Sequence, residues 1–157
     1  MIINRSCNEF KFRHRSRKNQ ILYTSKKVKN DKDIINLINN FLKEKNSFIF
    51  ESVEKGKIKG RYTIFGKNPD KIWEFNQNNS YLIKGKKKIK LNKKPAILIE
   101  EIIENFKFQI PDGLPPISSI ISGYFSYDSI RYIENIPNSC KDDLKIPDVR
   151  LLRPRTL

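Results

Sequence analysis

The chain has 157 residues, of which 38% are hydrophobic, so it has room for one domain with a core of its own. Charged residues interrupt every apolar stretch well before the roughly 20 residues that a membrane span requires, and no cleavable leader is recognisable, so we expect a cytoplasmic protein with no membrane partner. The formal net charge of +15 is scattered, and a bias towards Ile, Asn and Lys from AT-rich codons explains it without a nucleic-acid partner.

Residues 1–20 form a basic segment with no helical or strand period. We expect an extension ahead of a domain that covers residues 21–157. An RNA-binding arm is the alternative, because aromatic residues lie among the cations. Cys7, Cys140 and the single histidine, His14, have no metal-like spacing, so neither a metal site nor histidine catalysis is expected in this chain.

The first regular elements follow the basic segment. A short strand is predicted at Ile21–Thr24, and an amphipathic helix that covers a sheet is predicted at Asp31–Lys45. Asn30 or Asp31 can serve as the N-cap, because a short polar side chain there accepts a hydrogen bond from a free backbone N–H group. The apolar positions of this helix recur at helical spacing and are Ile34, Ile35, Leu37, Ile38, Phe41 and Leu42.

Phe48–Gly66, with the sequence FIFESVEKGKIKGRYTIFG, is predicted to be a β-hairpin with a tip rich in Lys and Gly. Polar residues interrupt its strands where they should be half-buried, namely Glu51 and Ser52 in the first strand and Arg61 in the second. A buried charge is costly without a partner. Glu51 and Arg61 can therefore form a structural ion pair, or the three side chains can line a polar notch for a small zwitterionic ligand.

After the hairpin, short apolar runs alternate with turn residues, which is typical of an antiparallel meander. Turns are predicted at Asn68–Asp70, at Gln77–Ser80 and around Gly85, where neighbouring lysines would blunt an exposed sheet edge. Strands are predicted at Ile72–Phe75, Tyr81–Ile83 and Lys88–Leu91.

A second helix is predicted at Pro95–Phe106, and a stiff proline-rich loop follows it. Its outer face carries Glu100, Glu101 and Glu104. Helical spacing assigns its apolar face to Ile97, Leu98, Ile102, Ile103 and Phe106.

The next predicted strand lies within Ile117–Tyr127. Gly123 would let its backbone approach a neighbouring strand closely. Phe125 and Tyr127 share one face of the strand, and Tyr124 lies on the other. Packing in a core explains these aromatic residues without a catalytic role.

Asp128 is predicted to cap a helical turn at Ser129–Glu134. A polar connection over Asn135–Lys145 then leads to a last strand within Ile146–Pro154. Together these elements predict an α+β domain, in which two main helices pack against an antiparallel twisted sheet or sandwich.

From about Leu22 onwards the chain resembles the N-terminal domain of component I of anthranilate synthase, a chorismate-utilising enzyme. Thr63 stands where that family more usually has Ser. The motifs that carry the resemblance occur in the family's order and are ESVEKGKIKGRYTIFG, NPDKIW (Asn68–Trp73), LPP (Leu114–Pro116), GYFSYDSIRYIE (Gly123–Glu134) and IPDVRLLRP (Ile146–Pro154).

The resemblance implies an enzyme that converts chorismate and ammonia to anthranilate and pyruvate in tryptophan biosynthesis. It implies Mg²⁺ as cofactor and, as ammonia source, a glutamine amidotransferase subunit called component II. The family's metal ligands and catalytic residues lie in a chorismate-binding domain beyond the last strand. We therefore expect this chain to be truncated before that domain and inactive by itself.

The resemblance also implies a regulatory role, because the family's N-terminal domain holds most of the pocket for L-tryptophan, an allosteric feedback inhibitor. Ser52 is expected to contact the bound amino acid. Glu51 is expected to shape the pocket or face the amino group, and Arg61 is a further contact.

Three alternatives stay open. Component I of aminodeoxychorismate synthase, in the folate pathway, shares the fold and the substrate. The chain could instead be a free-standing small-molecule sensor domain. It could also be a basic nucleic-acid-binding module, whose binding would depend steeply on salt.

Overall fold

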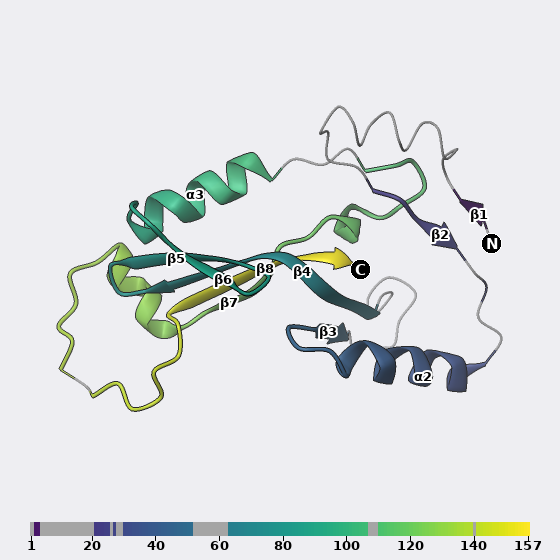
Figure 1. Ribbon diagram of the computed structural model, residues 1–157, viewed down its shortest axis with the longest axis horizontal. Helices are drawn as coiled ribbons and strands as arrows, with labels where there is room; N and C mark the ends of the chain where they lie inside the picture. The colour runs from purple at the N-terminus through teal and green to yellow at the C-terminus, as the bar shows by residue number, and fades with distance from the viewer. Residues whose placement is uncertain are drawn as a thin grey trace. The chain divides into compact units, whose positions relative to one another are not determined.

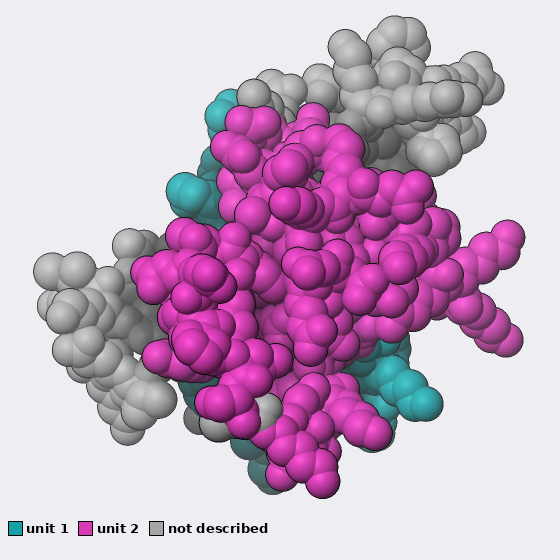
Figure 2. Space-filling view, turned by 90° about the vertical axis from the view of Figure 1, so that its left-hand side faces the viewer, with its two compact units in different colours: residues 1–65, 106–119 teal, residues 66–105, 120–157 magenta. Residues whose placement is uncertain are grey.

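The computed structural model of the chain describes residues 2–3, 21–25, 27, 30–51, 63–106, 110–139 and 141–157. These residues belong to two compact units, which Figure 2 shows in different colours. Unit 1 comprises Met1–Phe65 and Phe106–Ser119, and unit 2 comprises Gly66–Asn105 and Ile120–Leu157. In the described part of the chain, no helix is long and apolar enough to cross a membrane.

Strands dominate the regular structure of the described residues (Figure 1). The strands are β1 (Ile2–Ile3), β2 (Thr24–Ser25), β3 (Phe48–Glu51), β4 (Thr63–Asn76), β5 (Asn79–Lys84), β6 (Lys87–Leu91), β7 (Ser122–Phe125) and β8 (Val149–Thr156). The helices are α2 (Asp31–Leu42), α3 (Pro95–Asn105) and the 3-10 helices η1 (Pro116–Ser118) and η2 (Tyr127–Tyr132).

The main sheet has six strands and confirms the predicted α+β class. Strands β6, β5, β4, β8 and β7 lie antiparallel in that order, and β3 also pairs with β4. The predicted meander corresponds to β4, β5 and β6. A separate two-stranded sheet joins β1 to β2, so only the end of the strand predicted at Ile21–Thr24 is in a ladder.

The hydrophobic core of unit 2 lies between the sheet and α3 (Figure 1). It is built on Trp73 and Phe75 of β4, Val149 and Leu151 of β8, and Leu98 of α3. The register places Trp73 opposite Leu151 and Phe75 opposite Val149, so the apolar side chains of both strands share one face. Each such side chain stabilises the fold by about 1.5–3 kcal/mol when it is fully buried.

Helix α3 is confirmed, but part of its predicted apolar face is wrong. Ile97 is 50% exposed and Ile103 is 64% exposed, whereas Leu98, Ile99 and Ile102 pack on the core. The buried positions follow the spacing i, i+3, i+4 and i+7 from Pro95, which is itself buried. Ile97 and Ile103 fall outside that stripe, because the sequence offers more isoleucines than one helix face can bury.

Helix α2 is confirmed with Asn30 as its N-cap, since the Asn30 side chain accepts a hydrogen bond from the backbone N–H of Asp33 at 3.0 Å. It ends at Leu42, short of the predicted Lys45. Phe41 packs edge-to-face on Phe65 with 4.5 Å between ring centroids. The other predicted apolar positions are less covered than a core-facing stripe requires, because Ile34, Ile35, Leu37 and Leu42 are exposed.

The turn predicted at Asn68–Asp70 is wrong, because β4 runs through it as one strand of 14 residues. Asn68 has a φ of 53°, and the register with β8 shifts between Pro69 and Lys71. Turn-forming residues thus produce a β-bulge, which bends the strand without ending it. The predicted turn around Gly85 is confirmed, and the one predicted at Gln77–Ser80 is confirmed only in its first two residues, because Asn79 and Ser80 already belong to β5. Gln77 and Gly85 both have positive φ.

The segment after β7 also differs from the prediction. Phe125 is 57% exposed and Tyr127 is 85% exposed, so packing in a core does not explain them. The strand ends at Phe125, and the chain turns into η2 before Tyr127 can return to the sheet. Ser126, not Asp128, precedes this helix, and its side chain makes no capping hydrogen bond.

Gly123 confirms the predicted close approach of two strands. It lies opposite Leu151 in the β7–β8 ladder. A Cβ atom at this position would overlap with the carbonyl oxygen of Arg150 and lie 2.9 Å from the Cα atom of Leu151. Both obstacles are backbone atoms, so no rotamer change can relieve the overlap.

We expect Gly123→Ala to lower the free energy of unfolding by about 1–3 kcal/mol, because β7 must move away from β8 to admit the methyl group. Urea unfolding followed by circular dichroism measures this loss. Lys90→Ala, at an exposed position of β6, is the control and should change stability by less than about 0.5 kcal/mol. Equal stability of the two variants would contradict the close approach.

Candidate functional site

The structure places one of the three predicted effector contacts. Glu51 is the last residue of β3 and is exposed, so the prediction that it interrupts a half-buried strand is wrong. Ser52 and Arg61 lie outside the described residues. The predicted ion pair between Glu51 and Arg61 and the predicted polar notch therefore stay predictions.

The described part of β3 does supply an apolar wall. Phe48 and Phe50 lie two residues apart, on one face of the strand, with 5.0 Å between ring centroids. Phe48 is half-buried and Phe50 is 45% exposed. Glu51 alternates with them and lies on the opposite face with Ile49. One face of this short strand is thus aromatic, and the other carries one apolar and one acidic side chain.

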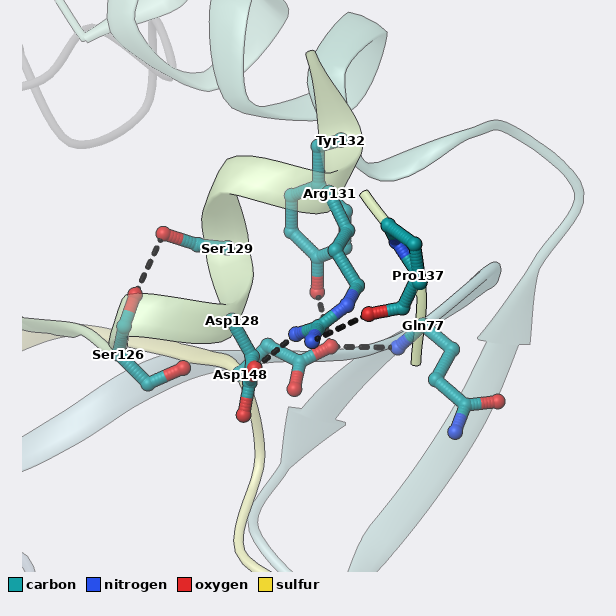
Figure 3. A network of polar contacts seen from close by, with 8 residues as sticks. All are labelled: Gln77, Ser126, Asp128, Ser129, Arg131, Tyr132, Pro137 and Asp148. Carbon is teal, nitrogen blue, oxygen red and sulfur yellow. Dashed lines mark hydrogen bonds and ion pairs between the residues drawn. The ribbon is translucent and has the colours of Figure 1, made fainter. Parts of the chain in front are cut away.

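A polar network centred on Asp148 holds η2 against the main sheet (Figure 3). One carboxylate oxygen of Asp148 accepts two hydrogen bonds, from the backbone N–H of Gln77 at 2.6 Å and from the hydroxyl of Tyr132 at 2.9 Å. The backbone carbonyl of Asp148 accepts a third, from the N–H of Ser126 at 2.7 Å. Burial raises the pKa of the Tyr132 hydroxyl, and the bond to Asp148 raises it further.

Arg131 extends this network along η2. Its guanidinium pairs with the carboxylate of Asp128 and donates to the carbonyl oxygen of Pro137 at 3.3 Å (Figure 3). Two buried atoms of the network, Ser126 Oγ and Arg131 Nε, have no hydrogen-bond partner in the described part of the chain. The network joins the β4–β5 turn, η2 and the start of β8, so its main effect is to fix their relative positions.

A second polar cluster surrounds the bulge of β4. Arg153 of β8 binds the Asp70 carboxylate through both Nε, at 2.7 Å, and Nη2. Burial alone would raise the pKa of the Asp70 carboxyl, but the hydrogen bond and charge of Arg153 outweigh it and hold that pKa below its ordinary value. The bond also raises the pKa of the Arg153 guanidinium.

An open hollow of about 590 Å³ lies beside this ion pair, within unit 2. It is lined by Asn68, Pro69, Asp70, Gly85, Arg155 and Thr156. A second hollow, of about 680 Å³, follows the polar side of α2 in unit 1 and is lined mainly by asparagines. In the residues that the structure describes, no group of three or more His, Cys, Asp or Glu side chains could hold a metal ion.

Sequence reasoning missed Asp148 and the Asp70–Arg153 pair. The sequence pattern places Asp70 in a predicted turn, and it places Arg153 in the last predicted strand. The available signal was an acidic residue two positions before an apolar strand and a basic residue directly after apolar strand residues, in two separate motifs. Their contact depends on the β4–β8 register, which the sequence did not supply.

The fold defines the chain as an α+β domain. Sequence similarity to known proteins indicates which family of such domains it resembles. The chain is 30% identical to anthranilate synthase component 1 of Cereibacter sphaeroides over 141 residues, which is 87% of this chain. It is 33% identical to the Acetivibrio thermocellus protein of that name over 75% of the chain. It is also 32% identical to the chloroplastic anthranilate synthase alpha subunit 1 of Oryza sativa over 69% of the chain. No protein-family model matches it.

The chain is therefore a relative of anthranilate synthase component I, and the resemblance seen in its motifs is confirmed. It spans only 21% to 28% of the length of the three relatives named. That small share is consistent with an N-terminal domain of a longer enzyme.

We expect Asp148→Ala to lower the free energy of unfolding by about 1–3 kcal/mol, because the Gln77 N–H and the Tyr132 hydroxyl lose their acceptor. Chemical unfolding monitored by Tyr and Trp fluorescence gives this value. Asp143→Ala removes an equally charged but exposed residue and should change stability by less than about 0.5 kcal/mol. If both variants lost the same stability, the network would not hold η2 in place.

Asp70 should make stability depend on pH. Its pKa is lower in the folded chain than the ordinary value of 3.8, so the ionised carboxylate stabilises the fold above that value. This contribution disappears as the pH falls through the folded-state pKa. Asp70→Asn should thus be less stable than the parent near neutral pH, by no more than about 1 kcal/mol because the pair is partly exposed, and the difference should vanish in acid.

Urea unfolding at a series of pH values tests this dependence. Asp143→Asn is again the control and should follow the parent chain at every pH. A constant deficit of Asp70→Asn across the series would assign its effect to packing and not to charge.

Proposed function

We propose that this chain is the N-terminal, tryptophan-binding portion of an anthranilate synthase component I. The observation that carries the proposal is its similarity to several proteins of that name over most of its residues. The relatives named above are all anthranilate synthases, which supports this function over that of aminodeoxychorismate synthase. We also propose a cytoplasmic location and a role in tryptophan biosynthesis.

The complete enzyme would convert chorismate and ammonia to anthranilate and pyruvate, with ammonia supplied by a component II. Mg²⁺ favours carboxylate oxygens and would act in the chorismate-binding domain. The described residues of this chain offer no cluster of three metal-ligating side chains, so no step of that chemistry is derived from them. The contribution of this chain would be control of the reaction.

L-tryptophan is proposed to bind beside β3. The rings of Phe48 and Phe50 provide an aromatic wall that suits an indole ring. Ser52 would contact the ligand, because a serine hydroxyl can donate a hydrogen bond to a carboxylate. Glu51 lies on the other face, so we assign it to shaping the edge of the pocket. Arg61 would supply a further contact to the carboxylate.

Feedback inhibition would then be a coupling between two sites. Tryptophan would favour one arrangement of this domain and the catalytic domain, and chorismate would favour the other. Such couplings are typically about 1–3 kcal/mol, which corresponds to a change in affinity of roughly 5-fold to 150-fold. The coupling is reciprocal, so chorismate should weaken the binding of tryptophan by the same factor.

We expect Ser52→Phe to abolish inhibition by tryptophan while turnover without tryptophan stays near normal, because the bulky ring fills the effector pocket and leaves the catalytic domain untouched. The measurement is anthranilate fluorescence during turnover by a polypeptide that joins this domain to its catalytic domain. Ser139→Phe, at an exposed position of the polar connection, is the control and should stay inhibited. Full inhibition of both variants would refute the assignment of Ser52.

A further inference from the structure

The hollow beside the β4 bulge is built by strand geometry. Asn68 has a φ of 53°, and the ladder with β8 slips between Pro69 and Lys71. Because a bulge bends its strand and leaves a residue out of the ladder, the sheet opens at this point. Gly85, in the β5–β6 turn, and Thr156, near the end of β8, complete the rim of the hollow.

Cations outnumber anions around this hollow. Its floor carries Asp70, but both carboxylate oxygens of that residue are bound by Arg153. Burial lowers the pKa of the nearby Lys71 ammonium, and the charges of Arg153 and Lys84 lower it further, against the effect of Asp70. Arg155 also lines the hollow, and no carboxylate of the described residues forms an ion pair with it.

The middle of the same sheet shows how the chain neutralises cations elsewhere. Glu74 accepts hydrogen bonds from Arg150 at 3.2 Å and from Lys88 at 2.8 Å, one through each carboxylate oxygen. Lys88 also lies over the ring of Tyr81, 4.5 Å from its centroid. The lining of the hollow has no second carboxylate that could neutralise its cations as Glu74 does. Positive potential therefore accumulates in this concave, polar depression.

We propose that this hollow binds a small multivalent oxyanion, such as a phosphate group or the carboxylates of a small organic acid. Arg155 is the principal ligand, because a guanidinium can donate two parallel hydrogen bonds to such a group. The Thr156 hydroxyl and the Asn68 side-chain amide are further donors. Lys71 and Lys84 add charge from the surroundings of the hollow. None of its residues belongs to β3, where tryptophan is proposed to bind, so the two proposals can be tested separately.

A metal cation is not the expected ligand, because the one carboxylate in the lining is already occupied by Arg153. A long nucleic acid is not expected either. Its phosphates would need a continuous cationic track, whereas this cluster surrounds one small depression. Binding of random RNA to the same residues with a steep salt dependence would overturn the small-ligand proposal.

The test uses the whole 157-residue chain and inorganic phosphate, with citrate as a second probe and chloride at matched ionic strength as the reference. Calorimetry gives the affinity, and NMR locates the site through the amide signals of Gly85 and Thr156. We expect phosphate or citrate, but not chloride, to shift both signals. If phosphate shifts these signals and citrate does not, the hollow is a phosphate site. If both anions shift them, it is a general site for oxyanions.

Arg155→Gln should weaken binding roughly tenfold or more, which is the loss of a charge-assisted hydrogen bond. Lys90→Gln removes the same charge from an exposed position of β6 outside the hollow and should leave the affinity within about twofold, because distant surface charges are screened. Circular dichroism checks that both variants remain folded. Equal weakening by both variants, or a response to chloride equal to that to phosphate, would overturn the proposal.

Discussion

The pairing of β4 with β8 is the constraint on which the sheet depends. It brings together segments more than 70 positions apart, and its register sets Phe75 against Val149, both of which are fully buried. One carboxylate contact lies at the end of this ladder and another at the bulge within it. Asp148 accepts a hydrogen bond from the N–H of Gln77 at the end, and Asp70 binds Arg153 at the bulge. A one-residue slip would send the apolar side chains to the opposite face and break both contacts, so the core and these two contacts together fix the register.

Local signals predicted most elements of the fold. The N-cap at Asn30, the Lys-rich turn at Gly85 and the bare backbone required at Gly123 each depend on a few neighbouring residues, and all are confirmed. Errors arose where long-range pairing decided the outcome. Residues that favour a turn form a bulge between Pro69 and Lys71, because β8 pairs with the strand on both sides of it. The buried stripe of α3 was misassigned at Ile97 and Ile103 for a related reason, since the sheet selects which isoleucines it covers.

The candidate sites also differ in whether local sequence is enough to find them. The Glu-Ser pair after Phe50 stands out in the sequence, because polar residues follow an apolar run directly, and one motif is enough to find it. The contacts of Asp148 with Gln77 and of Asp70 with Arg153 each join two motifs, so they become visible only once the register is known. A basic hollow beside a bulge is harder still to foresee. Scattered lysines and arginines in the sequence carry no sign of which ones will surround the same depression.

The place of β8 in the sheet has a consequence for synthesis on the ribosome. β8 is the last of the described strands along the chain, yet it lies between β4 and β7. The β4–β5–β6 meander can pair as soon as it emerges, but Trp73 and Phe75 lack their β8 partners until β8 appears. A nascent chain must therefore carry an incomplete sheet with exposed apolar side chains while the residues between Phe75 and Val149 are synthesised. Chaperone capture during that interval would be governed by the late arrival of a single strand.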